Sequence, residues 1–395
     1  MTEQYPSYQR NFFFYLLSQR RNFIPILSIY FLTLGDTNAA QIGIFMGIGH
    51  LASLLLEVPS AFFADRFGHK KTLILSKTLQ ILSVTMFLGA YFISAPGNFY
   101  VFIIAAILQS VGFSFFSGTT AAYYHELLEQ EGNGKDFGKR MSQLRGKVSL
   151  LSAAIIITLP FLVQFHITFP LVVNLLFDIG GLFVLFLLPN VSNNHHVGSN
   201  KKSIFVILSE VKKSGVLYIS IFMGVIVGFL IGENPFRAIY LESLGFPIIL
   251  IGTVMGFSRV VWFLVGHYAH YLEHYLSLRR LLFLELLLFP IVFLAVAHLT
   301  NPYLIGFIFI IIIGYQHGRK AILQGFILND FGIDKRYKAT TLSIESFVNS
   351  FSGMMVTFGI GFIMSYSYRL GYTILGILLF FLLSFIFYLI YKKRS

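Results

Sequence analysis

The chain has no cysteine among its 395 residues, and this absence excludes disulfides, thiolate metal sites and cysteine nucleophiles. Charged residues are also scarce at 12%, roughly half of the share in a soluble domain. Hydrophobic residues reach 56% and include 45 phenylalanines. We therefore expect an all-α protein whose surroundings are lipid rather than water.

Motifs for catalysis and nucleotide hydrolysis are missing as well. The chain contains neither a G-x-S-x-G nucleophile elbow nor a G-x-x-x-x-G-K-[ST] phosphate loop. The run His125–Glu129 resembles a zinc-binding H-E-x-x-H helix, but a glutamate replaces the second histidine. His195 and His196 lie in a polar stretch without a further ligand. We expect no enzyme, no bound metal and no cofactor.

Twelve apolar windows of about twenty residues follow one another, each long enough to cross a bilayer as a helix. They lie near residues 12–34, 40–63, 72–94, 99–124, 143–165, 168–189, 215–241, 247–270, 279–298, 303–328, 340–364 and 370–391. The sequence therefore predicts an integral membrane protein with twelve transmembrane helices.

Basic residues gather in alternate loops. The loop after the second window contributes Arg66, Lys70, Lys71 and Lys77, whereas the opposite set of loops holds only Arg369. Because positive residues mark the cytoplasmic side, both termini are predicted to be cytoplasmic. The net charge of +12 then reflects membrane topology, and no nucleic-acid partner is expected.

An internal repeat divides the chain. Shifted by 209 residues, the run Ile42–Gly47 overlies Ile251–Gly256, with the Ile, both Gly and the Met matched. Two pseudo-symmetric six-helix halves, 1–189 and 215–395, are therefore predicted. The polar stretch 190–214 between them is predicted to be a cytoplasmic linker.

One run carries a family resemblance. Glu57–Lys71 contains A-x-x-A-D-R-x-G-H-K-K, which resembles the G-x-L-A-D-R-x-G-R-K signature between helices 2 and 3 of the major facilitator superfamily. Ala61 replaces the first glycine and His69 the usual arginine. Phe116–Glu126 and Arg336–Ser343 further resemble the helix-4 and helix-11 motifs of a drug-efflux-like branch.

The resemblance implies the major facilitator fold and secondary transport by alternating access. It also implies that helices 1, 4, 7 and 10 line a central cavity. Ionisable residues at membrane depth are expected to be functional, because burying them unpaired costs several kcal/mol. The predicted substrate-binding residues are Arg20, Arg21, His50, Arg259, His317, Arg319, Lys320, Tyr123 and Tyr124.

Two basic pairs suggest an anionic substrate. Arg20 and Arg21 are expected about 13 Å inside helix 1, and Arg319 and Lys320 at a similar depth in helix 10. Arginine presents a fork of N–H groups that matches a carboxylate or phosphate. One member of each pair instead reaching the interface is the alternative. The two tyrosines would serve an aromatic cavity for lipophilic drugs.

Acidic residues supply the predicted proton carriers, which are Glu57, Asp178 and Glu233. Glu233 and Arg237 lie four residues apart and are expected to form an ion pair beside a helix break at Asn234-Pro235. A structural role for this pair and for the other acids is the alternative. The predicted gating residues are Asp65, Arg66 and Arg237, with Asp65 facing the start of helix 11 near Thr340.

These observations predict a proton-coupled exporter of a small organic anion, such as a polycarboxylate metabolite or a siderophore-like compound. The alternatives are a broad-specificity drug/proton antiporter and a proton-coupled anion importer. The expected partners are the small-molecule substrate, protons and the lipid bilayer. The protein is expected to act as a monomer in the inner membrane of a bacterium.

Overall fold

The computed structural model describes residues 7–34, 37–191, 216–268, 275, 277–330 and 338–392. Side chains are described throughout these ranges except at 7, 58, 61, 216, 320–330 and 338–343. In this part of the chain the regular elements are helices, without a strand. Nine described helices are long and apolar enough to cross a membrane, or ten when one bent pair is counted as a single span.

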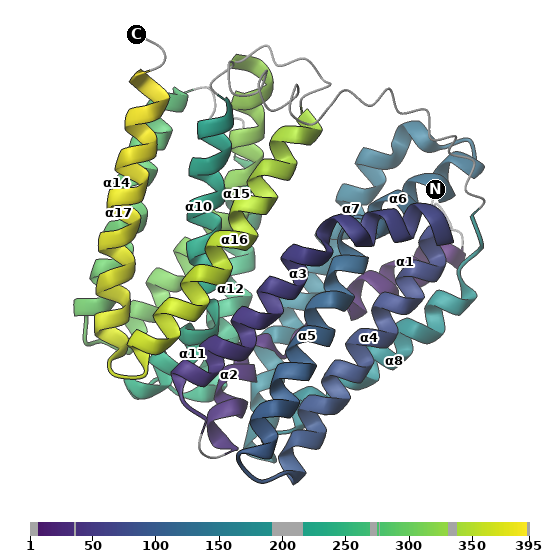
Figure 1. Cartoon of the computed structure of the whole chain (residues 1–395). Coiled ribbons are helices and arrows are strands. Elements are labelled where there is room, and N and C mark those ends of the chain that lie inside the picture. The colour runs from purple at the N-terminus through teal and green to yellow at the C-terminus, as the bar shows by residue number, and fades with distance from the viewer. Residues whose placement is uncertain are drawn as a thin grey trace. The chain divides into compact units, whose positions relative to one another are not determined.

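The first half contains eight α-helices, which include five of the membrane spans counted above (Figure 1). They are α1 (Ser7–Ser18), α2 (Ile24–Thr33), α3 (Ala39–Phe67), α4 (His69–Gly89), α5 (Gly97–Ser117), α6 (Thr119–Gln130), α7 (Phe137–Thr158) and α8 (Phe169–Leu187). Short 3-10 turns lie at Ala90–Phe92, Gly134–Asp136 and Leu159–Gln164. The first predicted span, window 12–34, is divided between α1 and α2. Helix α5 continues into α6 as one long apolar run.

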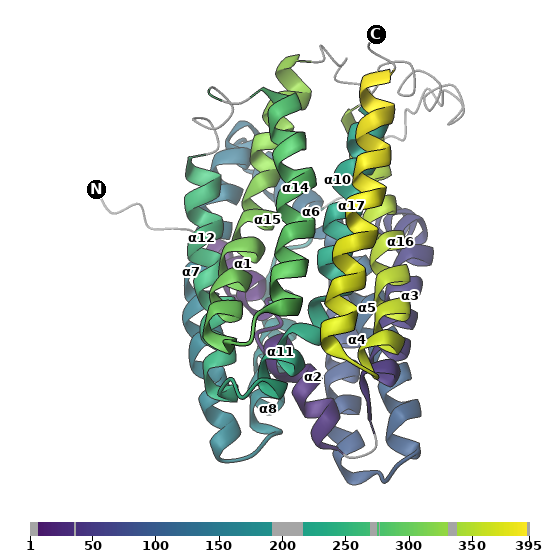
Figure 2. The ribbon, with the colours of Figure 1, turned by 90° about the vertical axis from the view of Figure 1, so that its left-hand side faces the viewer.

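The second half supplies the other five described spans, with one bent pair counted as a single span (Figure 2). Its helices are α10 (Val216–Gly232), α11 (Asn234–Ser243), α12 (Ile248–His267), α14 (Leu278–His298), α15 (Pro302–Asp330), α16 (Lys338–Met364) and α17 (Tyr368–Lys392). The helices α10 and α11 form one span that bends by 44° at Glu233. This bend lies beside Asn234-Pro235, where the sequence predicts a helix break, because proline cannot donate a backbone hydrogen bond.

The helices cluster into two compact units. The first unit comprises residues 1–37, 48–196 and 248–256, and the second comprises 38–47, 197–247 and 257–395. The predicted domain boundaries remain a prediction, because most of the expected linker lies outside the described residues. Within the first unit α4 packs against α5 and α8, and α1 packs against α8 (Figure 1). Within the second unit α10 packs on α16 and α14 on α17 (Figure 2).

Glycines set the close approach of α10 and α16. Gly224, Gly228 and Gly232 are four residues apart and so share one face of α10. A β-carbon at Gly228 would lie 2.5 Å from the Cβ of Ser352 and 2.8 Å from the carbonyl oxygen of Asn349. Small residues at this spacing allow two membrane helices to pack backbone against backbone.

An aromatic core supports the first unit. Phe12 of α1 stacks on Tyr124 of α6 with ring centroids 4.5 Å apart and planes within 2°. Tyr15, Tyr123 and Leu73 belong to the same cluster, and each is fully buried. This core holds α1 against α6 directly beside the break in the first span.

Candidate functional site

The break in the first span positions two arginines. Helix α1 ends at Ser18 and α2 begins at Ile24, so Arg20 and Arg21 leave the chain where it is not helical. The backbone of Arg21 has φ = 24°, in the left-handed region that non-glycine residues rarely adopt. Such backbone strain persists only where the surrounding structure over-determines it, and it is concentrated at functional sites.

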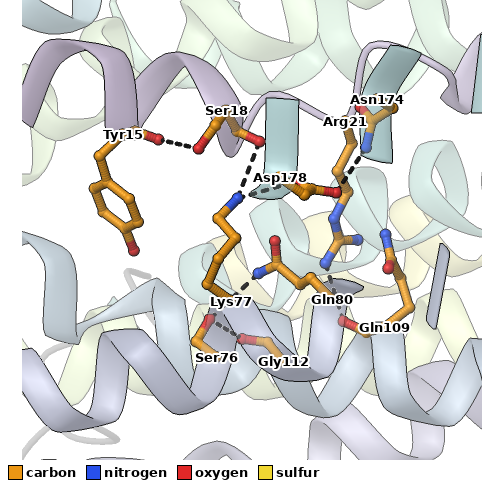
Figure 3. A network of polar contacts seen from close by, with 10 residues as sticks. All are labelled: Tyr15, Ser18, Arg21, Ser76, Lys77, Gln80, Gln109, Gly112, Asn174 and Asp178. Atoms are coloured by element: carbon orange, nitrogen blue, oxygen red, sulfur yellow. Dashed lines mark hydrogen bonds and ion pairs between the residues drawn. The ribbon is translucent and has the colours of Figure 1, made fainter. Parts of the chain in front are cut away.

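A buried ion pair lies directly beneath this break (Figure 3). The Nζ of Lys77 in α4 lies 2.8 Å from Oδ1 of Asp178 in α8, and it also donates to the carbonyl oxygen of Ser18 at 3.1 Å. Asn174, one turn earlier in α8, donates to the other carboxylate oxygen at 2.8 Å. Lys77 is 0% exposed and Asp178 is 3% exposed. The pair therefore links the end of α1 to both α4 and α8.

The position of Lys77 corrects the sequence analysis, which counted this residue with the cytoplasmic loop after the second window. Lys77 lies eight residues after the start of α4 at His69, about 12 Å along the helix axis. Counting basic residues along the chain cannot separate a loop lysine from one in the first turns of the next helix. The signal was the apolar window 72–94, which already contained it.

Helix α8 is shaped to admit the lysine. Asn174, Asp178 and Gly181 are spaced by four and three residues and so share one face. A β-carbon at Gly181 would lie 2.7 Å from the Cβ of Ser18 and 3.2 Å from the Cε of Lys77. Only glycine leaves room there for both the end of α1 and the lysine stem.

Arg21 extends from the break toward α5. Its Nη2 donates to the backbone carbonyl of Gln109 at 3.0 Å (Figure 3). The guanidinium also lies 4.7 Å from the ring centre of Phe113. Arg21 also interacts electrostatically with Asp178 and with the half-buried His50. Within the described residues no carboxylate forms an ion pair with Arg21. Asp178 is therefore the ion-pair partner of Lys77 and acts on Arg21 only electrostatically, from a greater distance.

Arg20 turns to a different neighbour. Its Nη2 donates to Oγ of Ser149 in α7 at 3.2 Å, and Arg145 lies within electrostatic range. The half-buried Arg20 thus adds to a local excess of positive charge. Arg20 and Arg21 point to different helices, as expected for adjacent residues.

The second predicted basic pair is arranged differently. Arg319 is 1% exposed and is held bidentately by Glu285 of α14, with Nε–Oε1 at 2.7 Å and Nη2–Oε2 at 2.5 Å. Tyr315 also donates to Oε1 of Glu285 at 2.9 Å. This arginine therefore already has an internal carboxylate partner. The side chain of Lys320 lies outside the described residues.

Glu233 and Arg237 form the ion pair that their spacing predicts, with Nε of Arg237 2.5 Å from Oε1 of Glu233. Arg237 also donates to the carbonyl oxygen of Leu230 at 2.8 Å, and Tyr372 donates to Oε2 of Glu233 at 3.3 Å. Both members are buried at the bend between α10 and α11. Their proton-coupling and gating roles stay predictions.

The remaining predicted site residues are dispersed over the two units. Tyr123 and Tyr124 are 0% exposed in the first unit's core, where Tyr123 donates to the carbonyl oxygen of Pro189 at 2.8 Å. Arg259 is half-buried in α12. His317 is exposed on α15, with its ring centre 5.2 Å from that of Trp262.

Glu57, Asp65 and Arg66 occupy the last part of α3, and all three are exposed. The guanidinium of Arg66 lies 5.5 Å from the ring centre of Phe67. The side chain of Thr340, the expected neighbour of Asp65, lies outside the described residues. Among the described residues no group of three His, Asp or Glu side chains is arranged to hold a metal ion.

Comparisons with known proteins agree with this architecture. The family model for the Major Facilitator Superfamily matches residues 12–354. The uncharacterized MFS-type transporter YxaM of Bacillus subtilis (strain 168) is 27% identical over 251 residues, 60% of each chain. The uncharacterized MFS-type transporter MT2531 of Mycobacterium tuberculosis (strain CDC 1551 / Oshkosh) is 29% identical over 127 residues, 28% of this chain and 30% of that one. The chain thus spans at most 60% of these relatives' lengths.

Solved structures match over almost the full length. The nucleoside transporter NupG superposes with a TM-score of 0.72 at 13% identity, covering 98% of this chain and 98% of that one. A D-xylose-proton symporter gives a TM-score of 0.68 at 14% identity, covering 96% and 95%. At such identities the likeness shows the fold alone. It confirms the predicted all-helical architecture of twelve spans in two halves.

Proposed function

The chain belongs to the major facilitator superfamily, and we propose that it is a proton-coupled secondary transporter whose substrate, a small organic anion, binds beside Arg21. A multi-pass transporter of a small molecule follows from the family. The anion, the coupling proton and the direction of transport are the proposal. Alternating access of the site between the two sides of the membrane would carry both ligands across.

One observation supports the anion above all others. Arg319 and Arg237 are each paired with a buried carboxylate, whereas Arg21 bonds only to a backbone carbonyl among the described residues. A cation in a low-dielectric site without its own counter-ion favours an anionic ligand. Arginine additionally offers several N–H donors in a planar fork that fits a carboxylate. The strained backbone at the helix break supports the same place.

The arrangement around Asp178 bears on the direction of coupling. Ionised Asp178 is the counter-ion of Lys77 and also acts on Arg21. When Asp178 takes up a proton, Lys77 loses its counter-ion and Arg21 loses the nearby negative charge, and a substrate anion replaces that charge. Proton binding and anion binding then strengthen each other, and this coupling is reciprocal. An anion and a proton bound together travel in the same direction, which favours import by proton symport over export by proton antiport.

Drug export and transport of a neutral solute draw less support. Lipophilic cations would meet the positive charges of Arg20, Arg21 and Lys77, and the tyrosines expected to form a drug cavity lie in the core. NupG is a nucleoside transporter and another structural neighbour is a D-xylose-proton symporter. We use a nucleoside and xylose as competing substrates in the test. The loop charges favour an orientation with both termini cytoplasmic. We further propose that the protein works as a monomer in the inner membrane of a bacterium.

The test is uptake by proteoliposomes that contain the full chain under an inside-alkaline pH gradient. The labelled anions are malate, gluconate and lactate. Labelled uridine, xylose and tetraphenylphosphonium are tested in the same way, as substrates of the competing functions. At least one anion is expected to accumulate, and the gradient is expected to drive it. Arg21→Ala should abolish uptake. Asp178→Asn should lose accumulation of the anion but retain exchange of labelled for unlabelled anion. The asparagine side chain is neutral like the protonated acid, but it can neither take up nor release a proton.

Arg140→Ala is the matched control. Arg140 is an arginine of the same unit that pairs with the exposed Asp136 at 3.5 Å, outside the network. Its loss should leave uptake unchanged, because exposed ion pairs contribute little. Accumulation of uridine, xylose or tetraphenylphosphonium without any of the anions would disprove the anion proposal. Anion uptake driven by an inside-acidic gradient would restore the exporter.

A further inference from the structure

Gln109 lies in the proposed site, and its side-chain oxygen has no hydrogen-bond partner among the described residues. Its backbone carbonyl accepts the hydrogen bond from Arg21, and its side chain stands beside the guanidinium (Figure 3). The residue is 9% exposed. Within the described part of the chain no donor reaches its Oε1. Buried polar atoms in folded proteins nearly always have a partner, so an orphan in a binding site points to a ligand or a water.

Arg21 has unused capacity at the same place. A guanidinium carries five N–H donors, and the bond to the Gln109 carbonyl uses one of them. The site therefore contains unused N–H donors on Arg21 and an unused acceptor, Oε1 of Gln109. Gln109 and Phe113 are four residues apart on α5, so the amide and the ring that flanks the guanidinium share one helix face.

We propose that Gln109 recognises a hydroxyl group on the bound anion, so that the substrates are hydroxylated carboxylates. The inference rests on the proposed function and assigns the substrate class of that site. The carboxylate pairs with the free N–H groups of Arg21, and a hydroxyl on a nearby carbon donates to Oε1 of Gln109.

The charges exclude the other common donor. An ammonium group would also donate to Oε1, but Arg21 and Lys77 would repel it in a site that already has two cations and one acid. A hydroxyl carries no charge. It both donates and accepts, so it can bond to either end of an amide. A hydroxylated anion thus satisfies both unfilled groups without adding positive charge.

The experiment uses pairs of acids of equal charge and equal carbon number that differ in hydroxyl groups. The pairs are malate and succinate, gluconate and hexanoate, and lactate and propionate. Dissociation constants are measured by calorimetry on the purified full chain in detergent. In at least one pair the hydroxylated acid should bind about tenfold or more tightly, since a site built to bond a hydroxyl discriminates strongly against its absence.

Two glutamine variants locate the effect. Gln109→Met keeps the side chain's length and removes the amide, so it should abolish the preference and leave the affinity of the plain acid within about twofold. Gln80→Met is the matched control. Gln80 is a glutamine of α4 that is 2% exposed, and its amide donates to Oγ of Ser76 at 3.2 Å. This variant should keep the preference. Gln109→Leu serves as the second test if the methionine variant fails to fold.

The outcomes separate this inference from the function it rests on. Equal affinities within every pair, with binding lost in Arg21→Ala, would overturn the hydroxyl assignment and retain the anion site. Equal weakening of both acids by Gln109→Met would show that the amide holds only a water or positions Arg21, and it too would overturn the assignment. Absence of binding by all six acids would overturn both proposals.

Discussion

Lys77 and Asp178 form an ion pair of 2.8 Å between α4 and α8, and both side chains are buried. The pair belongs to a network rather than standing alone, because the same ammonium caps the carbonyl oxygen of Ser18 where α1 ends. The network thereby connects two membrane helices to the break that presents Arg21. A change in the charge of Asp178 would be felt directly at that break.

The first prediction concerns the stability of this pair. Lys77→Met should lower the free energy of unfolding by about 3–5 kcal/mol, because Asp178 remains buried without its counter-ion. The double variant Lys77→Met/Asp178→Leu should recover most of this loss, since no buried charge is left. Thermal unfolding of the purified protein in detergent measures both. A double variant less stable than the single one would show that the network does more than neutralise charge.

The second prediction uses two adjacent glycines of α8. Gly181→Ala should displace Ser18 and the stem of Lys77, and should cost about 1–3 kcal/mol through overpacking. Gly180→Ala is the matched control, because its β-carbon would lie 3.2 Å from an edge atom of the Phe14 ring, which can shift. The temperature of thermal unfolding and the rate of anion uptake should both fall for Gly181→Ala and stay unchanged for Gly180→Ala. Equal effects of the two substitutions would contradict the tight fit at Lys77.

The third prediction tests the strained break. Arg21→Gly and Arg21→Ala both remove the guanidinium, so both should lose anion binding. They should differ in stability, because glycine adopts a positive φ freely and alanine does not. The glycine variant is expected to be about 1 kcal/mol more stable than the alanine variant. Calorimetry measures anion binding, and thermal unfolding measures stability. An alanine variant at least as stable as the glycine variant would refute strain at Arg21.

The fourth prediction separates Arg319 from the substrate. Arg319→Met should destabilise the protein by about 3–5 kcal/mol, because Glu285 would be left buried and unpaired. The double variant Arg319→Met/Glu285→Met should restore stability. If the anion binds only at Arg21, this double variant should keep its affinity for the anion within about threefold. A much larger loss of affinity would return Arg319 to the binding site, as the sequence suggested.

Local relationships were the ones that sequence reasoning could predict. Glu233 and Arg237 were expected to pair because residues four apart on a helix face the same way, and they do. The break beside Asn234-Pro235 followed from the chemistry of proline and is present as a bend. Glu285 and Arg319 lie on different helices, and no spacing rule relates such residues. Their pairing could therefore be recognised only in the tertiary structure.

The sequence by itself determined that the surroundings are lipid, how many helices cross the membrane, and which family the chain belongs to. Each follows from residues close together in the chain, namely the apolar windows, the charges of the loops and the run that ends at Lys71. The tertiary structure decided which charges are compensated. It brought Lys77 to Asp178 across 101 positions and left Arg21 on a backbone carbonyl. The physical reason is that a buried charge is stabilised by whatever group packing places within about 3 Å, and packing depends on helix contacts rather than on sequence separation.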